Sequence, residues 1–383
     1  MDTAGLRIAL FSGNYNYVRD GANQALNRLV EYLLRQGAAV RVYSPKVADP
    51  AFEPAGDLVG LPNLPIPTRK EYRVPLGLSA GIRRDLEEFA PNVVHLASPD
   101  PSSHRALTWA RKHGVPALAS VHTRFETYLR YYGMAFAEPW IEAGLRRFYR
   151  RCDALVAPSE SMAEVLREQG MNRDIGIWSR GVDRDVFNSA RRDSDWRRAL
   201  GIADDEVAIG FLGRLVMEKG LDVFSDTITE LRRRDVRHTV LVIGEGPARG
   251  WFEEHLPQGA FVGFQQGPDL GRAVASMDLL FNPSITETFG NVTLEAMACG
   301  LPVVAARATG STSLIEDGTT GTLVEPGNVT GFADVLARYI DSPELRRAHG
   351  QAGENRSRDY SWDRINQTVA DRYVRLVEAR AQR

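Results

Sequence analysis

Short apolar runs alternate along the chain with longer stretches in which apolar residues recur at helical spacing. An uninterrupted apolar run is typical of a parallel strand covered on both faces, and the amphipathic stretches supply that cover. Strands are predicted in the first half at residues 8–11, 39–43, 93–97, 117–121 and 154–157, and in the second half at 207–212, 239–243, 279–282, 302–306 and 321–324. This rhythm predicts an α/β fold with two doubly wound domains.

Two helices and one linker complete the predicted organisation. One amphipathic helix covers residues 22–35 and another covers 362–383, which needs an apolar surface to pack against. Residues 181–198 are rich in Arg and Asp and lack apolar periodicity, so we predict a surface linker there with a domain boundary near Asn188. A chain of 383 residues suits two domains. The expected division is 1–188, 189–361, and a final helix, 362–383, packed back on the first domain.

Composition narrows the class of protein. The chain is 43% hydrophobic and 25% charged, as globular proteins are, and its net charge of -2 argues against a nucleic-acid partner. Cys152 and Cys299 have no CxxC partner and are expected to be buried thiols in a reducing cytoplasm. No apolar run approaches the ~20 residues of a membrane-spanning helix, and no export signal is visible.

Two carboxylates flank a predicted helix start in the run Glu287-Thr-Phe-Gly-Asn-Val-Thr-Leu-Glu295. If a helix begins near Gly290, its free N–H groups and positive dipole end form a diphosphate site between the two acids. The rise of a helix would separate the carboxylates by roughly 10 Å, about the length of a sugar diphosphate. Spacing alone would favour two solvated acids at a helix start, but the preceding strand and the glycine between the acids reverse that preference toward a ligand site.

Two cations follow the predicted strand 207–212. Gly213 is succeeded by Arg214 and, five residues later, Lys219. Charged groups at the carboxyl edge of an open α/β sheet are placed as ligand-binding residues are, and Arg and Lys together can neutralise a leaving diphosphate without a metal. By itself this spacing would more often mark a solvated surface, so its value depends on the acid pair in the same domain.

Taken together, these motifs resemble the retaining GT-B glycosyltransferases of family four, among them bacterial mannosyltransferases and sulfolipid synthases. The resemblance spans essentially the whole chain and also rests on Arg180-Gly-Val-Asp183 and Gly244-Glu-Gly-Pro247. It implies an α/β fold of two Rossmann-like, doubly wound domains facing each other across a cleft, with a nucleotide sugar held by the second domain. The implied contacts are Arg214 and Lys219 with the diphosphate, Glu287 and the backbone of Phe289, Gly290 and Asn291 with the transferred sugar, Glu295 with the ribose, and Gly263 and Phe264 with the base.

The first domain offers fewer matches. Gly21, before the helix at 22–35, would allow close approach of the backbone to a phosphate, although a simple turn glycine is as plausible. His122 ends the predicted strand 117–121, and its position and the family pattern favour a contact with the donor sugar over a structural role. The acceptor is expected against this domain.

Neither of two D-x-D tripeptides, Asp183-Arg-Asp185 and Asp193-Ser-Asp195, is expected to bind a metal. Both lie in the Arg-rich linker rather than at a strand edge, where helix caps and chance are the usual explanation. No His or Cys cluster has zinc spacing. We therefore expect no metal and no cofactor, with the nucleotide sugar acting as a co-substrate.

Aromatic and arginine residues mix at 124–132 and 145–151. This composition fits a membrane-surface patch as well as it fits an ordinary amphipathic helix with a solvated basic face. The expected location is cytoplasmic, with peripheral contact at the inner membrane face as one alternative.

The expected activity is transfer of a hexose-type sugar from a UDP- or GDP-sugar to a hydroxyl of a lipid, glycolipid or saccharide acceptor, as an α-mannosyltransferase would do. The resemblance implies retention of configuration by front-face attack, with the catalytic set Arg214, Lys219, His122 and Glu287. A sugar-nucleotide epimerase shares the fold and would need no acceptor. A non-catalytic nucleotide-sugar sensor would lack the cations or acids that this chain retains.

Overall fold

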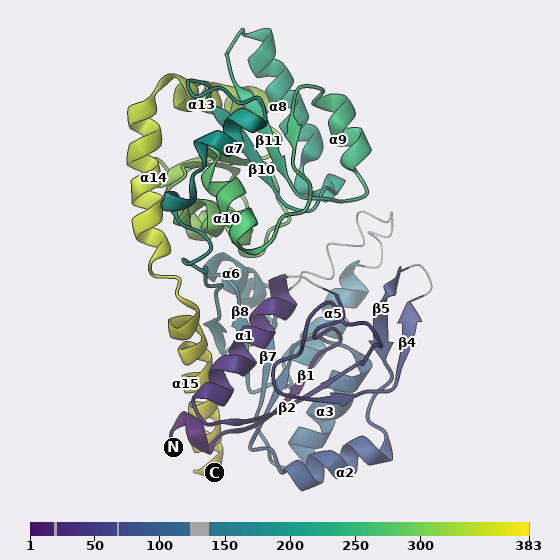
Figure 1. The fold of residues 1–383 in the computed structure, drawn as a ribbon. Coiled ribbons are helices and arrows are strands. Elements are labelled where there is room, and N and C mark those ends of the chain that lie inside the picture. The colour runs from purple at the N-terminus through teal and green to yellow at the C-terminus, as the bar shows by residue number, and fades with distance from the viewer. Residues whose placement is uncertain (19–20, 67–68, 123–137, 383) are drawn as a thin grey trace. The chain divides into compact units, whose positions relative to one another are not determined.

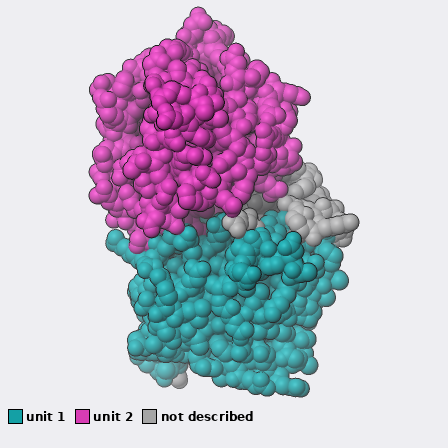
Figure 2. All heavy atoms as spheres, in the orientation of Figure 1, with its two compact units in different colours: residues 1–179, 362–383 teal, residues 180–361 magenta. Residues whose placement is uncertain are grey.

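The computed structural model describes residues 1–18, 21–66, 69–122 and 138–382. The chain forms two compact units, coloured separately in Figure 2: Met1–Ser179 together with Trp362–Arg383, and Arg180–Ser361. Each unit is built on a parallel β-sheet flanked by helices (Figure 1). The predicted α/β class with two doubly wound sheets is confirmed.

Unit 1 contains a parallel sheet in the order β3-β2-β1-β6-β7-β8-β9 and an antiparallel pair, β4 and β5. Its strands are β1 (Arg7–Phe11), β2 (Ala39–Ser44), β3 (Asp57–Gly60), β4 (Asn63–Ile66), β5 (Arg69–Pro75), β6 (Val93–Leu96), β7 (Ala117–Ser120), β8 (Ala154–Ala157) and β9 (Ile175–Ile177). Its helices are η1 (Thr3–Gly5), α1 (Gly21–Arg35), α2 (Ala80–Phe89), α3 (Pro101–Lys112), α5 (Glu138–Tyr149), α6 (Glu160–Glu168) and α15 (Trp362–Ala381).

Unit 2 contains a parallel sheet in the order β12-β11-β10-β13-β14-β15. Its strands are β10 (Ala208–Leu212), β11 (Thr239–Ile243), β12 (Ala260–Phe261), β13 (Leu279–Asn282), β14 (Val303–Ala306) and β15 (Gly321–Val324). Its helices are η3 (Ser189–Arg191), α7 (Ser194–Ala199), η4 (Met217–Lys219), α8 (Leu221–Arg233), α9 (Arg249–His255), α10 (Gly267–Ala275), α11 (Asn291–Ala298), α12 (Thr309–Leu314), α13 (Val329–Asp341) and α14 (Pro343–Ser357).

All ten strands predicted from apolar runs are present, within a residue or two at their ends. The predictions missed the antiparallel pair β4 and β5, the strands β3 and β9 at the two edges of the first sheet, and the two-residue strand β12 at an edge of the second. Burial explains the difference. An inner strand such as β6 is buried at every position, whereas β3 is partly exposed throughout and therefore carries no continuous apolar run.

The segment predicted to be a surface linker is instead packed into unit 2. Val182 and Phe187 belong to the apolar core of that unit, so the division falls between Ser179 and Arg180 rather than near Asn188. Arg197 is only 2% exposed, and its buried guanidinium is satisfied by donating to the carbonyl of Ser276 at 2.5 Å. A pattern of apolar residues cannot predict that this segment is buried, because one of its buried side chains is an arginine whose hydrogen bonds are made inside the protein.

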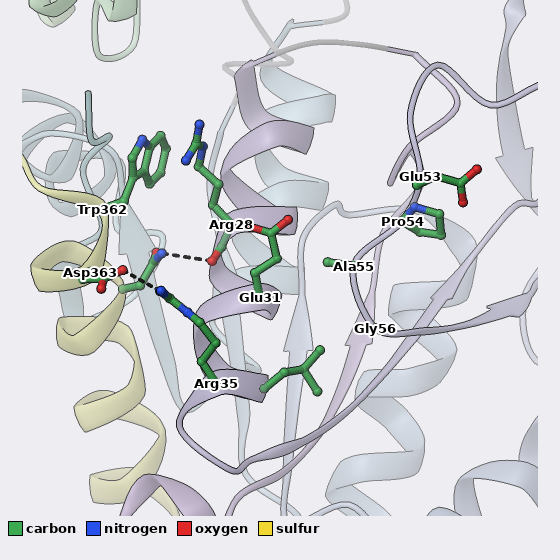
Figure 3. Close-up of a pocket in the computed structure, with 11 residues that line it drawn as sticks. Arg28, Glu31, Arg35, Glu53, Pro54, Ala55, Gly56, Trp362 and Asp363 are labelled. Atoms are coloured by element: carbon green, nitrogen blue, oxygen red, sulfur yellow. Dashed lines mark hydrogen bonds and ion pairs between the residues drawn. The ribbon is translucent and has the colours of Figure 1, made fainter. Parts of the chain in front are cut away.

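Helix α15 packs within unit 1 against α1 (Figure 3). The Asn366 side-chain amide donates to the Arg28 carbonyl at 3.2 Å, and the Arg35 guanidinium pairs with Asp363 at 2.6 Å. The Arg28 guanidinium lies over the Trp362 ring. A cavity of about 650 Å³ is lined by these residues and by residues 53–56, and it contains none of the side chains predicted to carry the chemistry.

Candidate active site

The candidate residues of unit 2 gather at one edge of its sheet. The chain runs outward from β10 to β11 and β12 on one side, then returns to place β13 on the other side of β10. In an open parallel sheet, ligands bind at such a reversal, beyond the carboxyl ends of the strands. Arg214 and Lys219 follow β10, and Glu287, Gly290 and Glu295 follow β13. The fold therefore brings both predicted motifs to the reversal point.

Lys219 and Glu287 form an ion pair at this point. The Lys219 Nζ lies 2.5 Å from Glu287 Oε1, and the two side chains are 29% and 16% exposed. The Thr286 hydroxyl also donates to the carbonyl of Glu218 at 3.2 Å, which ties the two loops together. The ammonium keeps two further protons for another acceptor. The sequence motifs did not predict this pair, because each motif had been assigned to a different part of the ligand.

Arg214 is the exposed cation of the site. Its guanidinium forms no ion pair or hydrogen bond with any residue that the structure describes, while its neighbour Gly213 donates its N–H to the carbonyl of Ile243 at 3.0 Å. A fixed backbone with an unpaired guanidinium can bind an anion without first breaking an internal contact.

Helix α11 begins where the sequence predicted. Gly290 is its N-cap residue, with a left-handed backbone (φ 98°) and no side-chain hydrogen bond to the helix start, so the first N–H groups remain available to a ligand. Asn291 is the first helical residue. The Phe289 side chain is buried and meets the Tyr360 ring edge to face, which leaves only its backbone to face a ligand.

Glu295 lies one turn inside α11. Burial, together with the negative charge of Glu287, raises the pKa of Glu295 to about 8. No residue in the described part of the chain donates a hydrogen bond to its carboxyl group. A carboxyl group that titrates near neutrality can either donate to or accept from a hydroxyl.

The loops after β11 and β12 complete this edge of the sheet. A Cβ atom on Gly244 would lie 1.9 Å from the carbonyl oxygen of Gly213, so only glycine allows the two loops to touch. The Gly244 N–H donates to the carbonyl of Gly263 at 2.9 Å. Phe264 follows with 62% of its surface exposed. The sequence motif containing Gly244 was recognised, but its role in supporting Gly213 was not.

In unit 1, Gly21 is the first residue of α1, and His122 follows β7. The His122 Nε2 is 2.8 Å from the Ser120 hydroxyl, and its ring meets the Trp178 ring edge to face at 5.3 Å. The half-buried imidazole is thus held by its own unit.

Among the described residues, no group of three or more His, Cys, Asp or Glu side chains could hold a metal ion. In the second tripeptide, Asp193 caps α7 by accepting from the Trp196 N–H at 2.8 Å. In the first, Asp183 accepts from the N–H of Asp185. Both tripeptides therefore have local structural roles.

The arginine and aromatic segment is only partly described, since 124–132 lies outside the described residues. Within α5, Trp140 is 81% exposed, and Arg147, also exposed, forms no ion pair with a described residue. None of the described helices is long and apolar enough to cross a membrane.

Known families match both halves of the chain. The model of glycosyltransferase family 4 matches residues 19–186, and that of glycosyl transferases group 1 matches residues 206–342. A GDP-mannose-dependent alpha-mannosyltransferase of Mycolicibacterium smegmatis is 31% identical, with 99% of this chain and 100% of that protein aligned. A sulfoquinovosyl transferase of Arabidopsis thaliana is 30% identical over 93% of this chain and 71% of its own length.

Solved structures share the fold. A sucrose-phosphate synthase from Thermosynechococcus elongatus superposes with a TM-score of 0.79 at 20% identity, covering 97% of this chain and 99% of that one. The Anabaena protein HepE, solved with UDP and glucose, gives a TM-score of 0.72 at 20% identity over 96% and 98% of the two chains.

Proposed function

Because this chain belongs to family 4 of the glycosyltransferases, we propose that it moves a hexose, with mannose as the first candidate, from a GDP- or UDP-sugar to a hydroxyl of a lipid or glycolipid. The chain is a retaining glycosyltransferase that draws its sugar from a nucleotide sugar. Mannose and a lipid acceptor are the narrower proposals. The names of the relatives support the first of these, since three GDP-mannose-dependent alpha-mannosyltransferases align with this chain.

The observation that carries the proposal is the cluster around the reversal point. Arg214, whose guanidinium has no partner in the described part of the chain, lies beyond two adjacent strands, β10 and β13, together with the Lys219–Glu287 ion pair and the N-terminus of α11. Together they would stabilise the negative charge that develops on a departing diphosphate. Arg214 and Lys219 are proposed to bind the diphosphate directly, without a metal.

The neighbouring groups would orient the rest of the donor. Glu287 and the backbone of Phe289, Gly290 and Asn291 are proposed to bind the hydroxyls of the sugar. Glu295 is proposed to bind the ribose hydroxyls, and Gly263 with the exposed Phe264 ring to lie against the base. His122 is proposed to contact the sugar, and Gly21 to allow backbone approach to the phosphate.

The proposed reaction is attack from the face that the diphosphate leaves. The bond between the anomeric carbon and the phosphate oxygen breaks as the acceptor oxygen bonds to that carbon. The acceptor proton passes to an oxygen of the departing phosphate. Positioning and electrostatic stabilisation would supply the rate enhancement, as no enzymic nucleophile is required.

The acceptor and location are proposed from α5. The exposed indole of Trp140 and the Arg147 guanidinium, which has no ion-pair partner among the described residues, share one surface of this helix. Such a pair suits the headgroup layer of an anionic membrane. We therefore propose a cytoplasmic enzyme that works peripherally at the inner membrane face.

A two-stage experiment tests the function. Thermal shifts with UDP, GDP, ADP and their sugar conjugates, each with magnesium and with EDTA, identify the donor, because a ligand of the native state raises the melting temperature. Glu295→Ala should lose the shift, whereas Glu344→Ala, at an exposed position of α14, should keep it. Turnover of the selected donor is then followed with and without lipid acceptors. Release of an isomerised sugar nucleotide without acceptor would identify an epimerase, and binding without any turnover would identify a sensor.

A further inference from the structure

A chain of hydrogen bonds inside unit 1 connects the C-terminal helix to His122. The Tyr373 hydroxyl, on α15, is hydrogen bonded to Nδ1 of His95. Nε2 of His95 is 2.8 Å from the Ser120 hydroxyl, which is in turn 2.8 Å from Nε2 of His122. Side chains from α15, β6 and β7, and from the second residue after β7, thus form one continuous path.

The path is buried up to its last member. His95 and Tyr373 are 0% exposed and Ser120 is 2% exposed. Burial lowers the pKa of His95 to about 3, so its ring is neutral and carries a single proton. Burial also raises the pKa of Tyr373, which keeps its hydroxyl proton. In such an interior each polar proton needs an acceptor.

The protons can be arranged along this path in two directions. In one, Tyr373 donates to His95, His95 donates to Ser120, and the serine hydroxyl donates to Nε2 of the final imidazole. In the other, every bond is reversed, and the Tyr373 hydroxyl must donate elsewhere. Its bond to His95 is the only hydrogen bond of that hydroxyl among the described residues. The first direction gives an acceptor to each proton of the three buried residues Tyr373, His95 and Ser120, and is therefore favoured.

We propose that Tyr373, His95 and Ser120 are positioning residues that hold His122 as the neutral tautomer protonated on Nδ1. Nε2 then accepts from Ser120, and the Nδ1–H is the donor that His122 presents to a substrate oxygen. The role of that donor rests on the proposed contact between His122 and the donor sugar. Trp178 fixes the two rings, meeting those of His95 and His122 edge to face at 6.0 Å and 5.3 Å.

Nitrogen-15 NMR of the histidine rings in the full-length protein tests the tautomer directly. The His122 signals are assigned by comparison with His122→Gln. In the wild type, Nε2 is expected to give the signal of an unprotonated nitrogen, and Nδ1 that of a protonated one. Tyr373→Phe removes the donor that sets the direction, so a mixture of tautomers is expected. A protonated Nε2 in the wild type, or His122 signals that Tyr373→Phe leaves unchanged, would overturn the proposal.

Tyr339→Phe is the matched control. Tyr339 is also a buried tyrosine bonded to a histidine, at 2.7 Å from Nδ1 of His349, but it lies in unit 2. Its loss should leave the His122 signals unchanged. Any perturbation of His122 by this control equal to that of Tyr373→Phe would mean that general destabilisation, rather than the hydrogen-bond path, determines the tautomer.

Kinetics separate this proposal from the proposed function. Tyr373→Phe is expected to raise the KM for the donor roughly two- to tenfold while the protein remains folded, the loss typical of one weakened neutral hydrogen bond. If His122→Gln retains full turnover and the tautomer is as expected, the path stands and the contact with the sugar is wrong. If His122→Gln is inactive and the wild-type Nε2 is protonated, the contact stands and the path is wrong.

Discussion

The Lys219 ammonium lies 2.5 Å from the Glu287 carboxylate, which joins a residue assigned to the phosphates to one assigned to the sugar. Lys219→Ala and Glu287→Ala should each lower kcat, and the double variant should lose less than the product of the two separate losses, because the residues act as one unit. The kcat values of the four proteins measure the coupling.

The control for this cycle is the exposed pair of Arg237 and Asp205, 2.7 Å apart, which precedes β11 and β10 at the opposite edge of the sheet. Removal of that pair should leave kcat unchanged. Strictly multiplicative losses at Lys219 and Glu287 would show that the ion pair has no joint role in turnover.

Arg214→Ala should separate activity from stability. The guanidinium is exposed and has no described partner, so its removal should leave the melting temperature unchanged. If it stabilises the leaving diphosphate, kcat should fall by about 10²- to 10³-fold. Arg347→Ala, another exposed arginine in unit 2, should change neither quantity. Near-normal turnover of Arg214→Ala at saturating donor would rule out the assigned role.

Glu295 should make stability depend on pH. Its pKa in the folded protein is about 8, above the ordinary value of 4.5, so the folded state binds the extra proton between these values. Its contribution to stability is present below pH 4.5 and is lost as the pH rises through 8. Glu295→Gln, which has no proton to lose, should therefore gain melting temperature relative to the wild type as the pH rises from about 5 to about 8. Parallel curves for the two proteins would contradict the raised pKa.

Gly244→Ala should disrupt the donor site by pushing the Gly244 loop away from the Gly213 loop that it contacts. The new Cβ would meet the Gly213 carbonyl oxygen at 1.9 Å, and the backbone there has φ 141°, so the substitution should cost several kcal/mol of stability, roughly 2 or more. Thermal shifts by the donor nucleotide should shrink as well. Gly250→Ala is the control, because no atom lies within 4 Å of its Cβ and the residue is helical. Equal effects of the two substitutions would exclude the close approach as the cause.

Trp140 and Arg147 provide the test of membrane contact. The double variant Trp140→Ala with Arg147→Ala should lose flotation with liposomes that contain anionic lipid. Leu64→Ala with Arg347→Ala removes an exposed apolar side chain and an exposed arginine elsewhere, and should float as the wild type does. Absence of flotation in the wild type would count against the lipid surface altogether.

Most of the fold follows from apolar patterning, since strands such as β6 and β13 are buried throughout and therefore read as continuous runs. The start of α11 was also predictable, because a glycine before a helical run marks it. Contacts between motifs were not. The pairing of Lys219 with Glu287 depends on β10 and β13 being neighbours, which only the strand order reveals. The path from Tyr373 to His122 likewise joins residues far apart in the sequence.

The place of α15 in unit 1 imposes an order on biosynthesis. Helix α15 (Trp362–Ala381) can pack against α1 in the first unit only after the ribosome has made all of the second unit and then α15 itself. Until then, the part of unit 1 on which α15 buries Val369, Ala370 and Tyr373 remains open to water or to a chaperone. The nascent first unit is therefore the stage at which this polypeptide is most prone to aggregate.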